Sequence, residues 1–204
     1  MIGVAPAPVA VAPDRAWFDR PAIELARELL GARLVHRSPD GVVGGRIVEV
    51  EAYRGPEDRA AHSARGRTPR NAIMFGPPGH LYVYLIYGLH HCLNVVAGPG
   101  PKPEAVLIRA LDIDEGIELA RVRRGPSALD HRLAAGPGNV GRALGVDLAQ
   151  NGADLLTGPV RLVPRVGPMP RRRRGPRIGV DYAGDWAARP MRFWIADDRH
   201  VSRR

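Results

Sequence analysis

The sequence has little cysteine, little lysine and no long hydrophobic run. Cys92 and Lys102 are the only residues of their types in 204 positions. A single cysteine excludes an internal disulfide framework and favours a cytoplasmic protein. No apolar segment approaches the roughly 18 residues that a membrane-spanning helix requires, so we expect no membrane partner. Gly and Pro are abundant, at 24 and 20 residues, which argues against an all-helical bundle.

The composition fits one globular domain. Hydrophobic residues make up 45% of the chain and charged residues 25%, which is ordinary for a folded protein with a substantial core. Residues 1–13 carry no charge and alternate Pro with Ala and Val, so we expect a disordered or loosely docked arm there. Residues 14–204 then form the folded domain.

Strand-like segments outnumber helical ones, and most of them are joined by short turns. This order predicts an α+β fold with a single domain built on an antiparallel sheet. Helices are expected over residues 21–30, 114–123 and 139–144, with the acidic residues at 112–115 marking the start of the second. Strands are expected over residues 32–37, 42–53, 81–87, 90–96 and 105–110, and shorter ones at 155–157, 160–163, 178–180 and 191–195.

Positive charge is concentrated in one segment. Basic residues exceed acidic ones by 30 to 21, which gives a net charge of +9. The segment Arg165–Arg177 contains six arginines and no acidic residue. Because arginine binds phosphate through paired N–H groups and keeps its charge, this segment predicts a polyanionic partner. A flexible, solvated basic loop is the alternative.

One predicted strand carries two carboxylates. Period-two alternation in Ile47–Tyr53 places Glu49, Glu51 and Tyr53 on the same face. That face is either a solvated acidic surface or the wall of a pocket, where a carboxylate beside a tyrosine acts as a general base. Alternation does not distinguish Glu49 from Glu51.

Tyrosines gather close to this strand. Four of the five tyrosines lie between residues 53 and 87, and three of them fall in one predicted hairpin strand. Tyr84 and Tyr87 have opposite parity, so one can face a pocket while the other points outward near the Gly88 turn. Aromatic strands commonly form core. Beside an arginine-rich segment, however, these rings can stack nucleobases, each stack contributing about 1–3 kcal/mol.

Two other motifs carry less information. Residues 136–141 (GPGNVG) have the spacing of a dinucleotide-binding fingerprint, but no hydrophobic strand precedes them and Pro137 interrupts the turn. A glycine loop that opens a helix can still hold a phosphate through backbone N–H groups. His90, His91 and Cys92 are adjacent, and adjacent strand residues face opposite sides, so we expect no metal site there.

Five segments of the chain, taken in order, contain its most distinctive sequence motifs. They are RIVEVEAYRGPEDRAAHSARGRTPRNAIMF (46–75), GHLYVYLIYGLHHCLNVV (79–96), AVLIRAL (105–111), GPGNVGRALGV (136–146) and RIGVDYAGDWAARPMRFWI (177–195). With them the sequence resembles, over residues 19–202, the alkyladenine (3-methyladenine or methylpurine) DNA glycosylases of the mammalian type. The resemblance implies a curved antiparallel sheet with flanking helices and a protruding aromatic hairpin.

The resemblance assigns roles at the base pocket. Glu51 matches the general base that activates water, and Arg109 matches a residue that helps to hold the water and a phosphate. Asn94 matches the residue that discriminates against the exocyclic amine of guanine. The positions that sandwich the flipped base are matched by Tyr53, His62 and Tyr84.

Other residues are expected to contact the DNA. Tyr87 matches the wedge that fills the gap left in the duplex. Gly136, Gly138 and Asn139 match a phosphate-binding turn, in which many relatives carry lysine at the Asn139 position, and His90 replaces an aromatic residue near the hairpin tip. The basic segment adds four consecutive arginines, Arg171, Arg172, Arg173 and Arg174.

The resemblance implies a monofunctional DNA glycosylase that flips alkylated or deaminated purines out of duplex DNA and hydrolyses the N-glycosidic bond, initiating base excision repair. We expect a monomer that acts on double-stranded DNA without a metal ion or cofactor, on the nucleoid if the source is bacterial. Lyase activity needs an amine for a Schiff base, and Lys102 lies in a Pro-flanked loop. The competing classes are a non-catalytic nucleic-acid-binding module and a metal-dependent nuclease that uses Asp112, Asp114 and Glu115.

Overall fold

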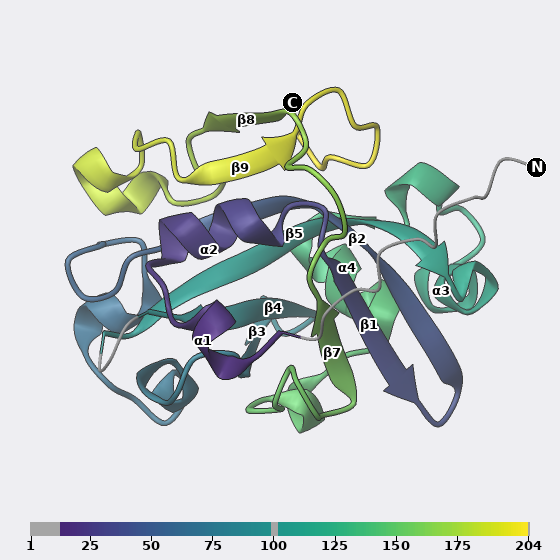
Figure 1. Ribbon diagram of the computed structural model, residues 1–204, viewed down its shortest axis with the longest axis horizontal. Coiled ribbons are helices and arrows are strands. Elements are labelled where there is room, and N and C mark those ends of the chain that lie inside the picture. The colour runs from purple at the N-terminus through teal and green to yellow at the C-terminus, as the bar shows by residue number, and fades with distance from the viewer. Residues whose placement is uncertain (1–12, 99–101, 204) are drawn as a thin grey trace, which may run out of the picture.

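One antiparallel sheet organises the chain, and the computed structural model describes it over residues 13–98 and 102–203 (Figure 1). Neighbouring strands follow the order β3-β4-β5-β2-β1-β7, while β9 pairs with β2 and β8 pairs with β9. The central strands are β2 (Gly41–Tyr53) and β5 (Glu104–Glu115). The other strands are β1 (Arg33–Ser38), β3 (Leu81–Ile86), β4 (His90–Ala97), β6 (Ala134–Ala135), β7 (Val160–Val163), β8 (Arg172–Gly175) and β9 (Arg192–Ile195).

Strand β2 is the branch point of the sheet. It pairs with β5 over most of its length, with β1 near its start, and with β9 at Glu49–Glu51. Register shifts on either side of Glu49 mark β-bulges, which bend a strand and increase its twist. The sheet is therefore curved at the point where β2 carries its two glutamates.

Helix α2 (Ala22–Leu29) packs on one face of this sheet, against β2 and β5 (Figure 1). Beyond the bulge at Glu49, even-numbered residues of the two strands, such as Val50 and Ile108, belong to one continuous core with the helix. The odd-numbered residues Glu51 and Tyr53 at this end of β2 point to the opposite face. The helix contributes residues spaced three and four apart, as an amphipathic helix requires: Ala22, Leu25, Ala26 and Leu29.

Shorter helices surround the sheet. Helix α4 (Pro137–Leu144) packs on β4 and β5, and α3 (Ile117–Arg124) packs on α4. None of the helices in the described parts of the chain has the length and hydropathy needed to cross a bilayer. The remaining helices are α1 (Arg15–Phe18) and the 3₁₀ helices η1 (His62–Arg65), η2 (Ala72–Phe75), η3 (Asp130–Arg132), η4 (Leu148–Gln150) and η5 (Asp181–Trp186).

The expected fold class is confirmed, together with most of the expected elements. The helix expected over residues 21–30 forms as α2, and the Glu104 carboxylate accepts the Ala22 N–H at 2.5 Å at its start. The five long strands form close to their expected bounds, although β5 continues to Glu115. Of the arm expected over residues 1–13, all but Pro13 lies outside the described residues.

Several local expectations are wrong. The acidic residues at 112–115 end β5, because their backbone continues the pairing with β2, and α3 begins only at Ile117. Residues 155–157 form a turn, and the segment 178–180 contains a bend at 178–179. In the second case the Ile178 N–H binds a carboxylate and not a neighbouring strand. The basic segment, for which a flexible, solvated loop was the alternative, contains β8, which pairs with β9.

Candidate active site

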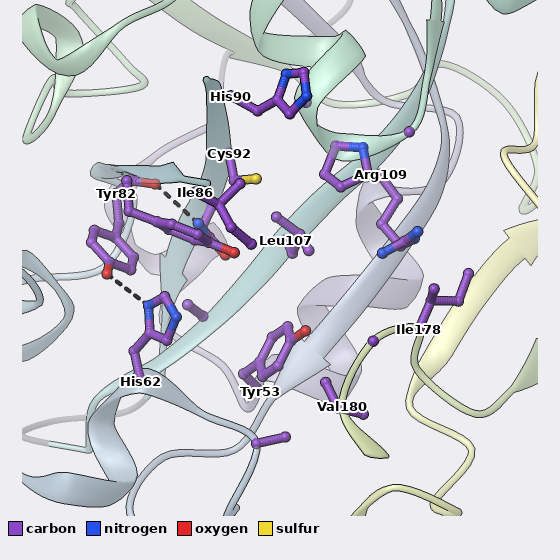
Figure 2. A pocket seen from close by; sticks show the side chains of 18 of the residues that line it. Tyr53, His62, Tyr82, Ile86, His90, Cys92, Leu107, Arg109, Ile178 and Val180 are labelled. Carbon is purple, nitrogen blue, oxygen red and sulfur yellow. Dashed lines mark hydrogen bonds between the residues drawn. The ribbon is translucent and has the colours of Figure 1, made fainter. Parts of the chain in front are cut away.

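A cavity of about 500 Å³ opens on the sheet face opposite α2 (Figure 2). Figure 2 shows Tyr53 at the end of β2, with His62 and Tyr82 to one side and Ile178 and Val180 to the other. Most of the site residues expected from the sequence line this cavity: Tyr53, His62, Tyr84, Tyr87, Asn94, Arg109, Gly136, Gly138 and Asn139.

The two glutamates of β2 are fully buried. Neither Glu49 nor Glu51 exposes any surface, so the alternative of a solvated acidic surface is wrong. Glu49 accepts hydrogen bonds from Arg109 Nε at 3.2 Å, Arg192 Nη1 at 2.9 Å and the Ser202 N–H at 2.7 Å. With two arginines and an amide bound to it, Glu49 is a structural anchor between β2, β5 and the C-terminal segment.

Glu51 has partners of another kind, since all of them line the cavity. Its Oε2 accepts the Tyr53 hydroxyl at 3.0 Å, and its Oε1 accepts the Ile178 N–H at 2.8 Å. Arg109 Nη1 lies 3.3 Å from the same Oε1. The Glu51 carboxylate is therefore held directly behind the cavity wall by residues that reach the cavity themselves.

Burial controls the basicity of Glu51. Desolvation raises the pKa of Glu51 above its ordinary value, while the Arg109 charge, the Ile178 N–H and the Tyr53 hydroxyl partly oppose this. A carboxylate with a raised pKa is a stronger base once it is ionised. The position of Glu51 suits proton abstraction from a water molecule, whereas the arginine-bound Glu49 does not.

A buried ion pair holds the segment that binds Glu51. Arg177 binds Asp58 through two N–H···O contacts of 2.5 and 2.8 Å, and neither side chain is exposed. The guanidinium also donates to the Ala52 carbonyl at 3.0 Å and lies 4.7 Å from the centre of the Tyr53 ring. Because Arg177 precedes Ile178, this pair fixes the segment whose N–H binds Glu51. Sequence reasoning counted Arg177 only as part of the basic segment.

Aromatic residues form the opposite wall. The rings of His62 and Tyr84 meet edge to face with centroids 4.5 Å apart. His62 Nδ1 lies 2.8 Å from the Tyr82 hydroxyl (Figure 2). Burial and the nearby Arg70 lower the pKa of His62, and burial raises the pKa of Tyr82 to about 12. The lowered pKa favours a neutral imidazole, which shares a hydrogen bond with the Tyr82 hydroxyl.

Tyr82 was not among the expected site residues. Its even number, shared with Tyr84, places it on the same face of β3 and was the signal available in the sequence. The Tyr82 backbone carbonyl also accepts Asn94 Nδ2 at 3.1 Å. Asn94 is 4% exposed and lines the cavity. This bond fixes the orientation of the Asn94 amide at the cavity wall.

Tyr87 lies outside the cavity core, at the tip of the β3–β4 hairpin. It is 85% exposed, whereas Tyr84 is half-buried, as their parity allowed. Its φ angle of 54° is in the left-handed region, which a residue of this size rarely adopts. Strand β3 ends at Ile86, one residue earlier than expected, because Tyr87 and Gly88 make the turn.

The start of α4 forms another part of the rim. Gly136 donates its N–H to the Arg109 carbonyl at 2.9 Å, and Asn139 Nδ2 donates to the Ala135 carbonyl at 2.7 Å. A side chain at Gly138 would come within 2.7 Å of the His90 ring, so glycine is required there. The first-turn N–H groups at Gly138 and Asn139 have no acceptor within the helix.

The arginine-rich segment is divided between two faces. In the ladder with β9, Arg173 pairs with Trp194, which pairs with Glu49 of β2, so Arg173 lies on the cavity face. Arg174 pairs with the core residue Phe193 and therefore lies on the α2 face. By the same alternation, Arg171 lies with Arg173 and Arg172 lies with Arg174. None of these four arginines lines the base cavity.

The sequence raised two further chemical possibilities. In the described residues, no three His, Cys, Asp or Glu side chains lie close enough to share a metal ion. Lys102 Nζ lies 2.8 Å from Glu57 and 2.9 Å from Glu104, outside the cavity. These carboxylates raise the pKa of Lys102, which disfavours the neutral amine that attacks a carbonyl carbon.

Known proteins resemble this chain along nearly its whole length. Residues 16–199 match the profile of the methylpurine-DNA glycosylase (MPG) family. A relative from Streptomyces avermitilis is 48% identical over 200 residues, covering 94% of this chain and 93% of its own. Relatives from Methanocella arvoryzae (47% identical, covering 93% and 95%) and Myxococcus xanthus (48% identical, covering 92% and 91%) are similar. All three are provisionally named 3-methyladenine DNA glycosylases. The chain therefore belongs to the methylpurine-DNA glycosylase family, whose members hydrolyse the N-glycosidic bond of damaged bases in DNA repair.

Proposed function

We propose that this glycosylase is monofunctional and that Glu51 activates the water molecule that replaces a damaged purine. One observation carries the proposal: the buried Glu51 carboxylate is bound by Tyr53, Ile178 and Arg109, all of which line a cavity of about 500 Å³. A base held in that cavity would bring its sugar carbon close to the carboxylate. The site residues expected from the resemblance to mammalian-type glycosylases line the same cavity, which supports assigning the protein to that type.

The base must leave the duplex before it can react. Extrusion costs a few kcal/mol, and stacking contributes about 1–3 kcal/mol for each aromatic contact. Tyr53 on one wall, with His62 and Tyr84 on the other, offers such contacts. The exposed Tyr87 at the hairpin tip suits insertion into the gap that the base leaves behind.

Bond cleavage needs stabilisation of positive charge on the sugar. As the bond from C1′ to the base nitrogen breaks, the sugar becomes oxocarbenium-like, and the departing base takes the bonding electron pair. The Glu51 carboxylate stabilises this cation, accepts a proton from water and directs the oxygen to C1′. Arg109, 3.3 Å from Glu51 Oε1, keeps the carboxylate oriented. A cationic alkylated purine leaves as a neutral base, whereas a neutral purine must also gain a proton.

We assign selection among purines to the cavity wall formed by β3 and β4. Asn94 is fixed by its bond to the Tyr82 carbonyl at 3.1 Å, so it cannot swing aside for a purine with an additional exocyclic amine. We therefore attribute discrimination against guanine to the space that Asn94 occupies. The His62 imidazole and the Asn94 amide give the cavity two hydrogen-bonding groups for a purine edge.

The remaining assignments follow from the same site. We also propose that the protein acts as a monomer. Lys102, held between Glu57 and Glu104, is unsuited to Schiff-base chemistry, which favours hydrolysis over lyase activity. We place the protein with its substrate, double-stranded genomic DNA containing damaged purines, in the cytoplasm and on the nucleoid if bacterial. Neither a metal ion nor a cofactor enters the scheme.

A panel of duplexes tests this proposal. Each contains one lesion (3-methyladenine, 7-methylguanine, ethenoadenine or hypoxanthine) and is scored for released base with and without a chelator. We expect free base and an intact abasic strand, unaffected by the chelator. Retention of DNA without base release would indicate the binding module, strand scission at the abasic site would indicate a lyase, and sensitivity to the chelator would contradict the scheme.

A further inference from the structure

A second groove lies on the other side of the sheet from the base cavity. It has a volume of about 510 Å³ and is lined by Arg27 of α2, Phe193 of β9, Met169, Pro170 and the four consecutive arginines at 171–174. Phe193 belongs to the core beneath α2, and its ladder partner is Arg174. Because paired residues of antiparallel strands share a face, the groove opens on the α2 face.

The arginines of the basic segment differ in how far their charge is neutralised. Arg165 and Arg177 are bound to Glu28 and Asp58. Arg171 and Arg173, at the groove, both contact Asp197. These four arginines therefore carry partly neutralised charge.

The other two arginines of β8 at the groove keep their full charge. Arg172 and Arg174 form no ion pair with another residue in the described part of the chain, and no carboxylate is among the residues that line the groove. Arg27 lies over the Phe193 ring, 5.7 Å from its centre, and adds a third guanidinium. The charge available to an external anion is thus concentrated on the face away from the base cavity.

We propose that this groove binds the phosphates of a second DNA segment while the base cavity holds the first. Arginine forks match phosphate oxygens in pairs. The groove opens on the opposite face of the sheet, so its phosphates come from a segment other than the one whose base is extruded. Two sites on one protein raise the effective concentration of each segment at the other.

An acidic protein strand fits this surface less well. Such a strand would have to add to the free edge of β8, which spans only Arg172–Gly175 and lies between Pro170 and Pro176. Proline next to a short edge strand limits strand addition. Phosphates need no backbone pairing, because the guanidinium groups alone bind them.

Two labelled duplexes test this groove. The first contains an abasic site and a donor dye, and the second is undamaged and carries an acceptor dye. Binding of the second is measured with and without the first, over a range of salt. We expect one protein to bring both dyes together. Each phosphate contact contributes about 0.9 to the slope of log K against log salt, so Arg172→Ser with Arg174→Ser should lower the second duplex's slope by about 1.8.

A pair of exposed arginines outside the groove is the matched control. Arg37→Ser with Arg161→Ser removes the same charge from β1 and β7 and should change the second duplex's slope by less than one contact, about 0.9. Equal losses from the two double variants would overturn the proposal, as would a complex that holds only one duplex. Stronger displacement by polyglutamate than by unlabelled duplex would indicate an acidic protein partner. The donor dye reports binding of the first duplex separately. Loss of binding at the base cavity can therefore be distinguished from loss of binding at the groove.

Discussion

At the scale of single residues, Glu49 and Glu51 differ in their partners and not in their burial. Alternation along β2 correctly placed both on one face, but it could not choose between them. Their different partners, Arg192 and Ile178, lie more than a hundred positions away in the sequence. No local pattern contains that information. The difference between the two carboxylates depends on β9 and the segment before it, which pack beside β2 only in the folded protein.

Burial of Glu51 affects stability as well as reactivity. Its pKa is raised above 4.5 in the fold, mainly by desolvation, so the folded protein binds this proton more tightly than the unfolded chain. Its contribution to stability is then fully present below pH 4.5 and is lost as pH rises through the folded pKa. We expect Glu51→Gln, which cannot ionise, to raise the Tm near neutral pH and to change it less below pH 4.5. Calorimetry at both pH values measures this, and an equal Tm change at both would contradict it.

At the scale of elements, the sequence predicted the long strands because their apolar residues alternate. It missed β8 because four consecutive arginines have neither an apolar period nor strand propensity. That strand forms because β9 presents a free edge to it, which is a tertiary cause. The hairpin of β3 and β4 was predictable from its branched and aromatic residues, and its Gly88 turn from the glycine.

The hairpin tip gives an element-scale prediction. Tyr87→Ser should slow excision of a lesion in duplex DNA much more than in single-stranded DNA, because a wedge matters only where a partner base can reclaim the gap. Single-turnover excision on both substrates measures the difference. Tyr87→Phe keeps the ring and should behave like the wild type. An equal loss on the two substrates would assign Tyr87 a different role.

The segment at residues 176–180 gives a second element-scale prediction. Arg177→Met leaves Asp58 buried without its partner, a change that typically costs about 3–5 kcal/mol. It also loosens Ile178, whose N–H lowers the pKa of Glu51. We therefore expect reduced stability and an acid limb of the pH–rate profile that moves to higher pH. Arg189→Met, which removes an exposed guanidinium 3.7 Å from the Trp186 ring, is the control. Lower stability with an unchanged pH profile would make Arg177 purely structural.

At the scale of the whole molecule, the net charge of +9 correctly indicated a polyanionic partner but not where the charge is available. Much of the basic segment is paired with carboxylates from distant parts of the chain, such as Glu28 and Asp58. The residues that line the cavity are equally dispersed, from Tyr53 to Tyr182. Only the resemblance to a family, and not spacing, could group them in advance.

Asp197 limits the positive charge on the cavity face, since Arg171 and Arg173 both contact it. Its φ of 62° is tolerated by asparagine. Asp197→Asn should therefore release both arginines, tighten binding to damaged and undamaged duplex alike, and steepen the slope of log K against log salt by about 1. Asp130→Asn makes the same charge change at an exposed partner of Arg121 and should have less effect. Equal effects would show that only net charge matters.

The central claim is that Glu51 is the general base, and single-turnover excision of a neutral lesion tests it most directly. Glu51→Gln should slow excision by about 10²–10⁴-fold while binding to the same duplex is retained. Glu49→Gln, measured well below its lowered Tm, should cost far less, because Glu49 contacts arginines and an amide behind the site. Near-wild-type excision by Glu51→Gln, or a larger loss from Glu49→Gln, would contradict the account.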